Sequence, residues 1–77
     1  MPRPIITLTT DFGTRDYFAA AMKGVLLSIA PRAVLVDVTH EIDAFETQQA
    51  AFVVDQAVRC FPKGSIHVVV VDPGVGS

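Results

Sequence analysis

The sequence predicts an α/β fold in which a parallel sheet of three strands is connected by two helices. Three short apolar stretches, at residues 5–10, 33–38 and 65–71, have the length of strands, and the two longer stretches between them carry apolar residues at helical spacing. Strands that alternate with helices and are apolar almost throughout are typical of a parallel sheet that is covered on both faces.

The first strand and the first helix follow from residue type and spacing. Residues 5–10 are rich in β-branched side chains and end at a turn signal, Asp11-Phe12-Gly13. A helix is predicted over residues 16–29, with Thr14 as its N-cap and Pro31 beyond its end. The predicted apolar face of this helix consists of residues one helical turn apart, namely Phe18, Met22, Val25, Leu26 and Ile29.

The second half of the chain repeats this pattern. The strand at residues 33–38 is followed by a predicted helix over residues 45–61, which the Pro62-Lys63-Gly64 segment ends. The last strand, residues 65–71, is too apolar for a sheet with one solvent-exposed face. The inner face of the second helix is predicted to consist of Ala50, Val53, Val54, Ala57 and Phe61.

Composition and charge exclude several classes of protein. The 77 residues are 51% hydrophobic, which excludes a disordered chain, yet no apolar run approaches the roughly 18 residues of a membrane span. Six Lys and Arg residues stand against eight Asp and Glu residues, and the basic residues are scattered singly, so a nucleic-acid-binding face is not expected. The length fits one small domain or part of one. Two helices cannot cover both faces of three apolar strands well, and we therefore expect residues 1–77 to be the N-terminal part of a longer protein.

The single cysteine and the N-terminus predict a cytoplasmic protein. Cys60 has no partner for an internal disulfide, and its apolar neighbours predict a buried, unreactive thiol. The segment after Arg3 is short, broken by threonines and ends in an acid, so it is not a signal peptide.

Acidic residues and one imidazole gather where the three strands end. Asp11 follows the first strand, Asp37 and His40 lie at the end of the second, and Asp72 follows the third. In parallel α/β sheets, ligands bind beyond the carboxyl ends of the strands, so these residues are candidates for a site. Each also has a structural interpretation: Asp11 and Asp72 as turn residues, Asp37 as a hydrogen-bond acceptor for a loop backbone, and His40 as a loop histidine with its partners satisfied.

The chemistry of such a site stays open at the level of residue types. Asp11, His40 and Asp72 could hold a divalent ion, which would suit a metal-dependent phosphohydrolase. An acid at a strand end also binds ribose hydroxyls in nucleoside sites, with or without catalysis. The chain has neither a Gly-x-Gly-x-x-Gly motif nor a P-loop, so binding of a dinucleotide or of a nucleotide triphosphate in those ways is not supported.

Four ordered motifs carry a resemblance to a known family. They are Thr9-Thr10-Asp11-Phe12-Gly13-Thr14 with Asp16, Ala21-Met22-Lys23-Gly24-Val25, Val36-Asp37-Val38-Thr39-His40-Glu41-Ile42 and Val70-Val71-Asp72-Pro73-Gly74-Val75-Gly76-Ser77. With these motifs the chain resembles the N-terminal domain of the S-adenosyl-L-methionine (SAM) hydroxide adenosyltransferases, or SAM hydrolases, which are relatives of the SAM-dependent fluorinase and chlorinase.

The resemblance implies a fold, an assembly and a reaction. The chain would form the first part of a Rossmann-like N-terminal domain, and a β-rich C-terminal domain would be missing. The family's subunits form homotrimers that bind SAM between the N-terminal domain of one subunit and the C-terminal domain of its neighbour. Water, as hydroxide, attacks the ribose C5′ of SAM, and adenosine and methionine form without a metal or a cofactor.

The resemblance also implies roles for individual residues. Asp11 would accept both ribose hydroxyls of SAM, and Asp72 would be the acidic member of an Asp-Arg-His set that handles the attacking water. The arginine and the histidine of that set are expected beyond Ser77, so His40 is not given the catalytic role. Asp16 would line the methionine end of the site and Phe45 would pack against the substrate.

Two further details concern the last residues of the chain. The resemblance implies that Val75, Gly76 and Ser77 bring their backbone close to the ribose. Where this chain has Asp72, the fluorinase type carries a tyrosine. A carboxylate at that place would repel a halide and help deprotonate water, so the sequence favours hydrolysis over halogenation.

Overall fold

The computed structural model describes residues 3–13, 16–43 and 47–71. Three strands, β1 (Ile5–Thr10), β2 (Val34–Thr39) and β3 (Ile66–Val70), alternate with two helices, α1 (Phe18–Ile29) and α2 (Thr47–Cys60). The predicted order of elements is confirmed, and each element begins and ends within about two residues of its predicted range, the usual scatter of such boundaries. The predicted N-cap Thr14 lies outside the described residues.

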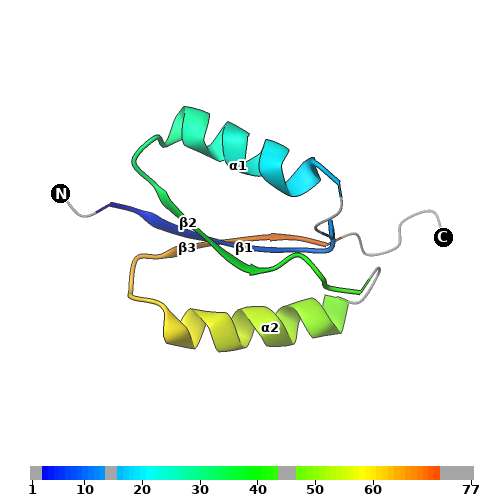
Figure 1. Cartoon of the computed structure of the whole chain (residues 1–77). Helices are drawn as coiled ribbons and strands as arrows, with labels where there is room; N and C mark the ends of the chain where they lie inside the picture. Colours follow the sequence, from blue (N-terminus) through cyan, green and yellow to red (C-terminus); the bar gives the residue numbers. More distant parts are fainter. Residues whose placement is uncertain (1–2, 14–15, 44–46, 72–77) are drawn as a thin grey trace.

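The sheet is parallel and has the strand order β2-β1-β3. Leu8 at the middle of β1 is in register with Asp37 of β2 on one side and with Val68 of β3 on the other. Figure 1 shows α1 and α2 on opposite faces of this sheet, which gives three layers. Because all strands run in one direction, the loops that follow β1 and β2 begin at the same edge, which we call the carboxyl edge.

The core lies around β1, the central strand. Ile6 and Leu8 point to the α1 face, where they form an apolar cluster with Ala33. The cluster is completed by partly buried side chains of the first helix and the outer strands, namely Met22, Leu26, Ala30, Leu35 and Val68. Thr7 and Thr9 alternate with these residues, so they point to the α2 face, and both are almost fully buried.

The predicted inner face of α1 is only partly right. Met22 and Leu26 pack against the core as expected. Phe18, Val25 and Ile29 are exposed instead, with Ile29 at 77%. The helix has apolar residues on most of its sides. The side that packs against the sheet is narrow and consists of Met22, Leu26 and Ala30, which are four residues apart.

Full burial of every strand was also predicted, and this is true only of β1, in which every residue after Ile5 is buried. β2 is half-buried, and Ile66, Val69 and Val70 of β3 are exposed. The strand order explains the difference, since the central strand has a neighbour on each side and a helix on each face, whereas β2 and β3 each pair with β1 alone among the described strands.

The predicted inner face of α2 is confirmed, and the prediction for Cys60 is wrong. Ala50 and Ala57 are buried, and Val53, Val54 and Phe61 are half-buried. Cys60 is exposed, and its thiol donates a hydrogen bond to the Gln56 carbonyl at 3.4 Å. It lies in the last turn of α2, where no described segment covers it.

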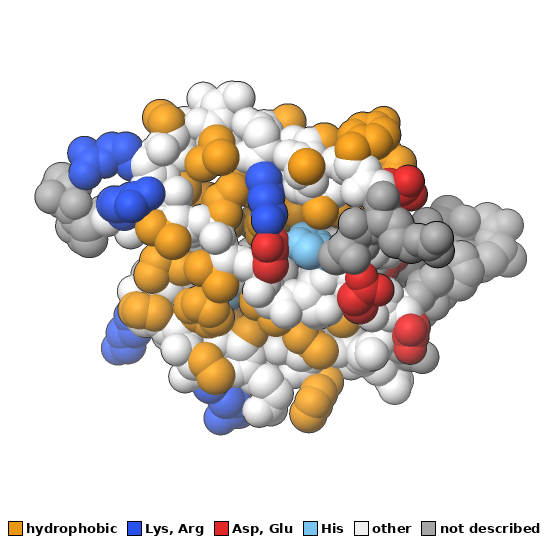
Figure 2. Space-filling model, in the orientation of Figure 1, with side chains coloured by type: hydrophobic (Ala, Val, Ile, Leu, Met, Phe, Trp, Pro, Cys, Tyr) orange, Lys and Arg blue, Asp and Glu red, His pale blue; other side chains and the backbone are white. Residues whose placement is uncertain are grey.

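The surface carries much apolar area and no dense patch of one charge sign on the face shown. Figure 2 shows apolar side chains over both helices on this face, with two neighbouring basic side chains at the upper left and the other basic side chains spread singly. Neither described helix is long and apolar enough to cross a membrane.

Candidate functional site at the carboxyl edge

Two neighbouring strands bring the first candidate residue into place. Thr10, the last residue of β1, is in register with Val70, the last residue of β3. The pairing continues for one more step, because the Asp11 N–H donates to the Val70 carbonyl at 3.2 Å. Asp11 is therefore held at the carboxyl edge in the middle of the sheet, and it is partly buried there.

The two residues after Asp11 are fixed by hydrogen bonds to their backbone. The Phe12 N–H donates to the Thr10 hydroxyl at 3.1 Å, and the Gly13 N–H donates to the His40 carbonyl at 2.6 Å. Gly13 has a φ of 74°, a left-handed conformation in which a residue with a Cβ would be strained. The Phe12 ring lies 6.1 Å from the Phe18 ring, so the loop also contacts the start of α1.

His40 ties the loop after β2 to the end of β1. Its ring is 6% exposed, and its Nδ1 lies 2.7 Å from the Thr10 hydroxyl. Its Nε2 lies 2.7 Å from Asp37 Oδ1. The Ile42 N–H also donates to the Thr10 carbonyl at 3.3 Å, so this loop is bound to β1 through backbone and side chain alike.

A lysine from the first helix completes the set. Lys23 Nζ lies 2.6 Å from Asp37 Oδ2, so the Asp37 carboxylate interacts with Lys23 through one oxygen and with His40 through the other. The hydrogen bond from Lys23 is the main reason why the pKa of Asp37 lies below its ordinary value; the His40 hydrogen bond lowers it further and partial burial opposes the shift. We call Lys23, Asp37, His40 and Thr10 the edge network.

The edge network bears on two of the interpretations that the sequence left open, those for His40 and Asp37. His40 is a buried histidine with both ring nitrogens hydrogen-bonded, as its structural interpretation predicted. Asp37 was expected to accept a hydrogen bond from loop backbone, and it accepts from two side chains instead. Lys23 was not singled out from the sequence, because its approach to β2 depends on how α1 is rotated on the sheet.

The geometry does not favour a metal site at His40, which was one of the alternatives that the residue types left open. Both of its ring nitrogens are used within the protein, so coordination of a metal would break one of two short hydrogen bonds. Within residues 3–13, 16–43 and 47–71, no three acidic, histidine or cysteine side chains are grouped as metal ligands. Asp72, the third proposed ligand, lies outside the described residues.

Of the other predicted site residues, the structure describes only Asp16. Asp16 precedes α1 and is exposed. Phe45, Val75, Gly76 and Ser77 lie, like Asp72, outside the described residues. Val70, two positions before Asp72 in the sequence, is hydrogen-bonded to the Asp11 backbone, so the described part of β3 ends beside Asp11.

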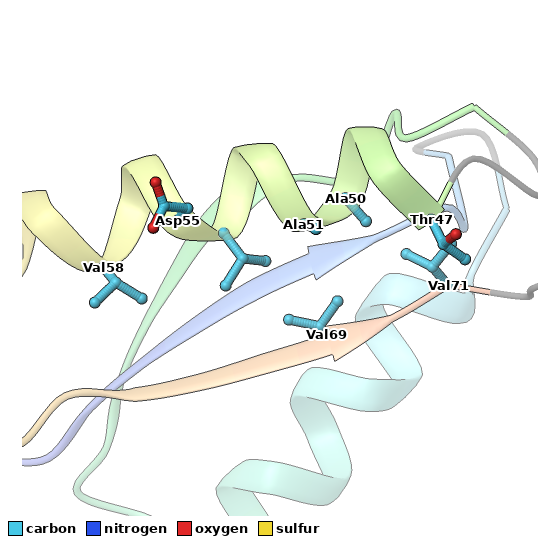
Figure 3. A pocket seen from close by; sticks show the side chains of 8 residues that line it. Thr47, Ala50, Ala51, Asp55, Val58, Val69 and Val71 are labelled. Carbon is cyan, nitrogen blue, oxygen red and sulfur yellow. The ribbon is translucent and has the colours of Figure 1, made fainter.

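A hollow of the described surface lies away from the edge network. It is a groove of about 620 Å³ between α2 and β3, with Val54, Val58 and Val69 among its lining residues. Figure 3 shows Val58 of α2 and Val69 of β3 extending into the space between the two elements. Thr47 and Asp55 are its only polar lining residues within the described chain, so the groove suits contact with an apolar surface better than catalysis.

Comparison with known proteins assigns the chain to a family. Residues 6–77 match the model of the SAM hydroxide adenosyltransferase N-terminal domain. The chain belongs to the SAM hydroxide adenosyltransferase family. The family resemblance drawn from the four motifs is thereby confirmed, and the motif around Asp11 and the motif around His40 both fall in the matched region.

Individual relatives are named as SAM hydrolases and as fluorinases. The chain is 47% identical, over 95% of its length, to the (R)-S-adenosyl-L-methionine hydrolase of Methanocaldococcus jannaschii. It is 34% identical, over 96% of its length, to the fluorinase of an Actinoplanes species. These matches cover 29% and 25% of the two relatives, so the chain spans less than a third of their length.

Solved structures support the same fold. A crystal structure of an uncharacterized conserved protein from Thermotoga maritima superposes with a TM-score of 0.86 and 36% sequence identity. The match covers 94% of this chain and 28% of that one. The chain thus has the same arrangement of strands and helices as part of a larger solved protein.

Proposed function

We propose that a protein with this chain as its N-terminal part hydrolyses SAM to adenosine and L-methionine. The observation that carries the proposal is the 47% identity to a named SAM hydrolase over 95% of the chain. The position of Asp11 at the carboxyl edge, next to the end of β3, agrees with a role in the site.

The proposed reaction is a displacement at the ribose C5′. The oxygen of water forms a bond to C5′ while the bond between C5′ and sulfur breaks, and the sulfonium sulfur leaves with the electron pair as the thioether of methionine. The sulfonium is a good leaving group, so the difficult part is activation of water, which loses its proton to a base. The reaction as proposed uses no metal and no cofactor.

Two residues of the chain have proposed roles in this reaction. Asp11 accepts hydrogen bonds from both ribose hydroxyls, which suits the two oxygens of a carboxylate. Asp72 orients the attacking water and helps to remove its proton, together with an arginine and a histidine from a later part of the protein. Asp16, Phe45, Val75, Gly76 and Ser77 are proposed to line the substrate.

The proposal extends to fold and assembly. The chain would form the first part of a Rossmann-like domain, and a β-rich domain would follow it. We propose a homotrimer in which SAM lies between subunits, and a cytoplasmic location.

Analysis of the products formed from SAM tests this proposal. Incubation of the full-length protein with SAM should release adenosine and methionine in equal amounts, with or without a chelator. Loss of activity in the chelator would favour a metal-dependent hydrolase, and binding without turnover would favour a nucleoside-binding module. Formation of 5′-halogenated adenosine in the presence of chloride or fluoride would favour the activity named for the Actinoplanes relative.

A further inference from the structure

Three side chains of the edge network have the order of a hydrolytic triad. An acid, an imidazole and a hydroxyl, from Asp37, His40 and Thr10, follow one another at 2.7 Å for each step. The hydroxyl is not placed to act as a nucleophile, because Thr10 is fully buried and its oxygen accepts the Phe12 N–H. The arrangement therefore needs another explanation than covalent catalysis.

When the imidazole is neutral, the donors and acceptors of these three groups can be assigned in only one way. An ionised Asp37 carboxylate only accepts, so the proton of the ring is on Nε2 of His40. Nδ1 then accepts the hydrogen of the Thr10 hydroxyl, and the lone pairs of that oxygen are left for the Phe12 N–H. The tautomer of His40 is thus assigned from its hydrogen-bond partners, and it leaves the Thr10 oxygen free to accept the Phe12 N–H.

We propose that His40 is a positioning residue for Asp11. Acting through Thr10, it fixes the backbone on both sides of Asp11, and its own carbonyl holds Gly13. Asp37 and Lys23 hold the His40 ring in turn. The inference rests on the proposed function, since it assigns the edge network to the binding of the ribose by Asp11.

The chain contains a matched pair that serves as a control. Thr7, on the same central strand as Thr10, forms the same kind of contact with His67 of β3, with its hydroxyl 2.6 Å from Nδ1. Thr7 lies three residues before Thr10, or roughly 10 Å along the strand, and points to the opposite face. It is as deeply buried as Thr10, so a substitution there reports the general cost of losing a buried threonine hydroxyl.

The test compares three variants of the full-length protein by steady-state kinetics with SAM. Thr10→Val removes the hydroxyl at nearly constant volume, and it should raise KM roughly tenfold, about the effect of one hydrogen bond, with a smaller change in kcat. Thr10→Ser keeps the hydroxyl and should restore a KM close to wild type. Thr7→Val should lower the melting temperature without a comparable rise in KM.

A double variant shows whether the effect passes through Asp11. If Thr10 acts by positioning Asp11, Thr10→Val should raise KM much less in the Asp11→Asn background than in the wild type. His40→Asn, which removes the ring, should likewise raise KM less in the Asp11→Asn background. This variant replaces Thr10→Val in the test if Thr10→Val does not fold.

The possible outcomes separate this inference from the proposed function. A wild-type protein without SAM turnover overturns the proposed function and the inference with it. An active wild type in which Thr10→Val leaves KM within threefold, or in which Thr7→Val raises KM equally, overturns the inference alone. Equal effects of Thr10→Val in both backgrounds would also contradict it.

Discussion

Asp37 is the residue at which charge most clearly contributes to this fold. Its carboxylate lies within hydrogen-bond distance of Lys23 and His40, and these contacts connect α1, β2 and the loop that follows β2. The Asp37 side chain is 44% exposed, so solvent screens both interactions and their contribution is modest. The pKa of Asp37 lies below its ordinary value of 3.8, mainly because Lys23 stabilises the ionised form.

This shift predicts a dependence of stability on pH. The unfolded chain takes up a proton at Asp37 at a higher pH than the folded chain, so the contribution of Asp37 is fully present above 3.8 and is lost as the pH falls through the folded pKa. Asp37→Asn should therefore lower the free energy of unfolding at pH 7, and the difference from wild type should shrink at pH 3. Urea denaturation at the two pH values measures this difference in the free energy of unfolding. An equal difference at both pH values would contradict the stabilising role of the ionised Asp37.

Asp11→Asn tests the proposed contact with the ribose. An acceptor that binds substrate and transition state alike affects mainly KM. Charge-assisted hydrogen bonds contribute about 1.5–3 kcal/mol, so KM for SAM should rise roughly ten- to a hundredfold in the full-length protein. A nearly unchanged KM with a collapsed kcat would move Asp11 from substrate binding to the chemical step.

Asp72→Asn tests the proposed activation of water. The amide keeps the shape of the side chain and loses its charge and most of its basicity, so kcat should fall by about 10²-fold or more while SAM still binds. Asparagine is also a good turn residue, and an aspartate that only forms a turn would tolerate it. A kcat within about threefold of wild type would remove Asp72 from the mechanism.

At the scale of elements, the sequence pattern predicted the bounds of helices and strands, which depend on neighbouring residues. β1 was predicted with its observed bounds, because β-branched residues at 5–10 and the turn at Asp11 are both local signals. The exposed side of α1 was not predicted, since Val25 and Ile29 fit an apolar helical stripe equally well. Which face a helix presents depends on how it rests on the sheet, and that contact is made between distant residues.

The same reasoning applies to the candidate site. The convergence of strand ends could be predicted, because the carboxyl ends of parallel strands share an edge. The partners of Asp37 could not, since Lys23 is fourteen positions away on a helix whose rotation the sequence leaves undefined. Thr10 was seen only as part of a motif, and its hydrogen bonds to His40 and Phe12 became evident from the fold.

The groove between α2 and β3 predicts self-association of the 77-residue chain. Val58 and Val69 are 48% and 43% exposed there, and no described strand pairs with the outer edge of β3. Val58→Lys should reduce the apparent mass measured by light scattering at high concentration. Val25→Lys, at an exposed valine of α1 away from the groove, is the control and should reduce it less. A monomeric wild type would contradict the prediction.

At the scale of the whole molecule, the described fold holds part of the proposed site. Asp11 and the edge network lie at one edge of a three-stranded sheet, and the relatives that the chain matches are more than three times as long as the matched segment. The proposed partners of Asp72, an arginine and a histidine, are expected after Ser77. A site that is shared between domains and subunits excludes water and aligns the attack only when all parts are present.

The 77-residue chain by itself should therefore not hydrolyse SAM, even when it is folded. Without the later basic residues, the water near Asp72 has neither a complete proton acceptor nor a fixed position, and without a covering domain the site stays open to bulk solvent. Purified chain incubated with SAM should release adenosine no faster than buffer, while the full-length protein releases it at once. Circular dichroism of the same sample is the control for folding. Turnover by the folded chain above the buffer rate would show that residues 1–77 contain the whole catalytic machinery.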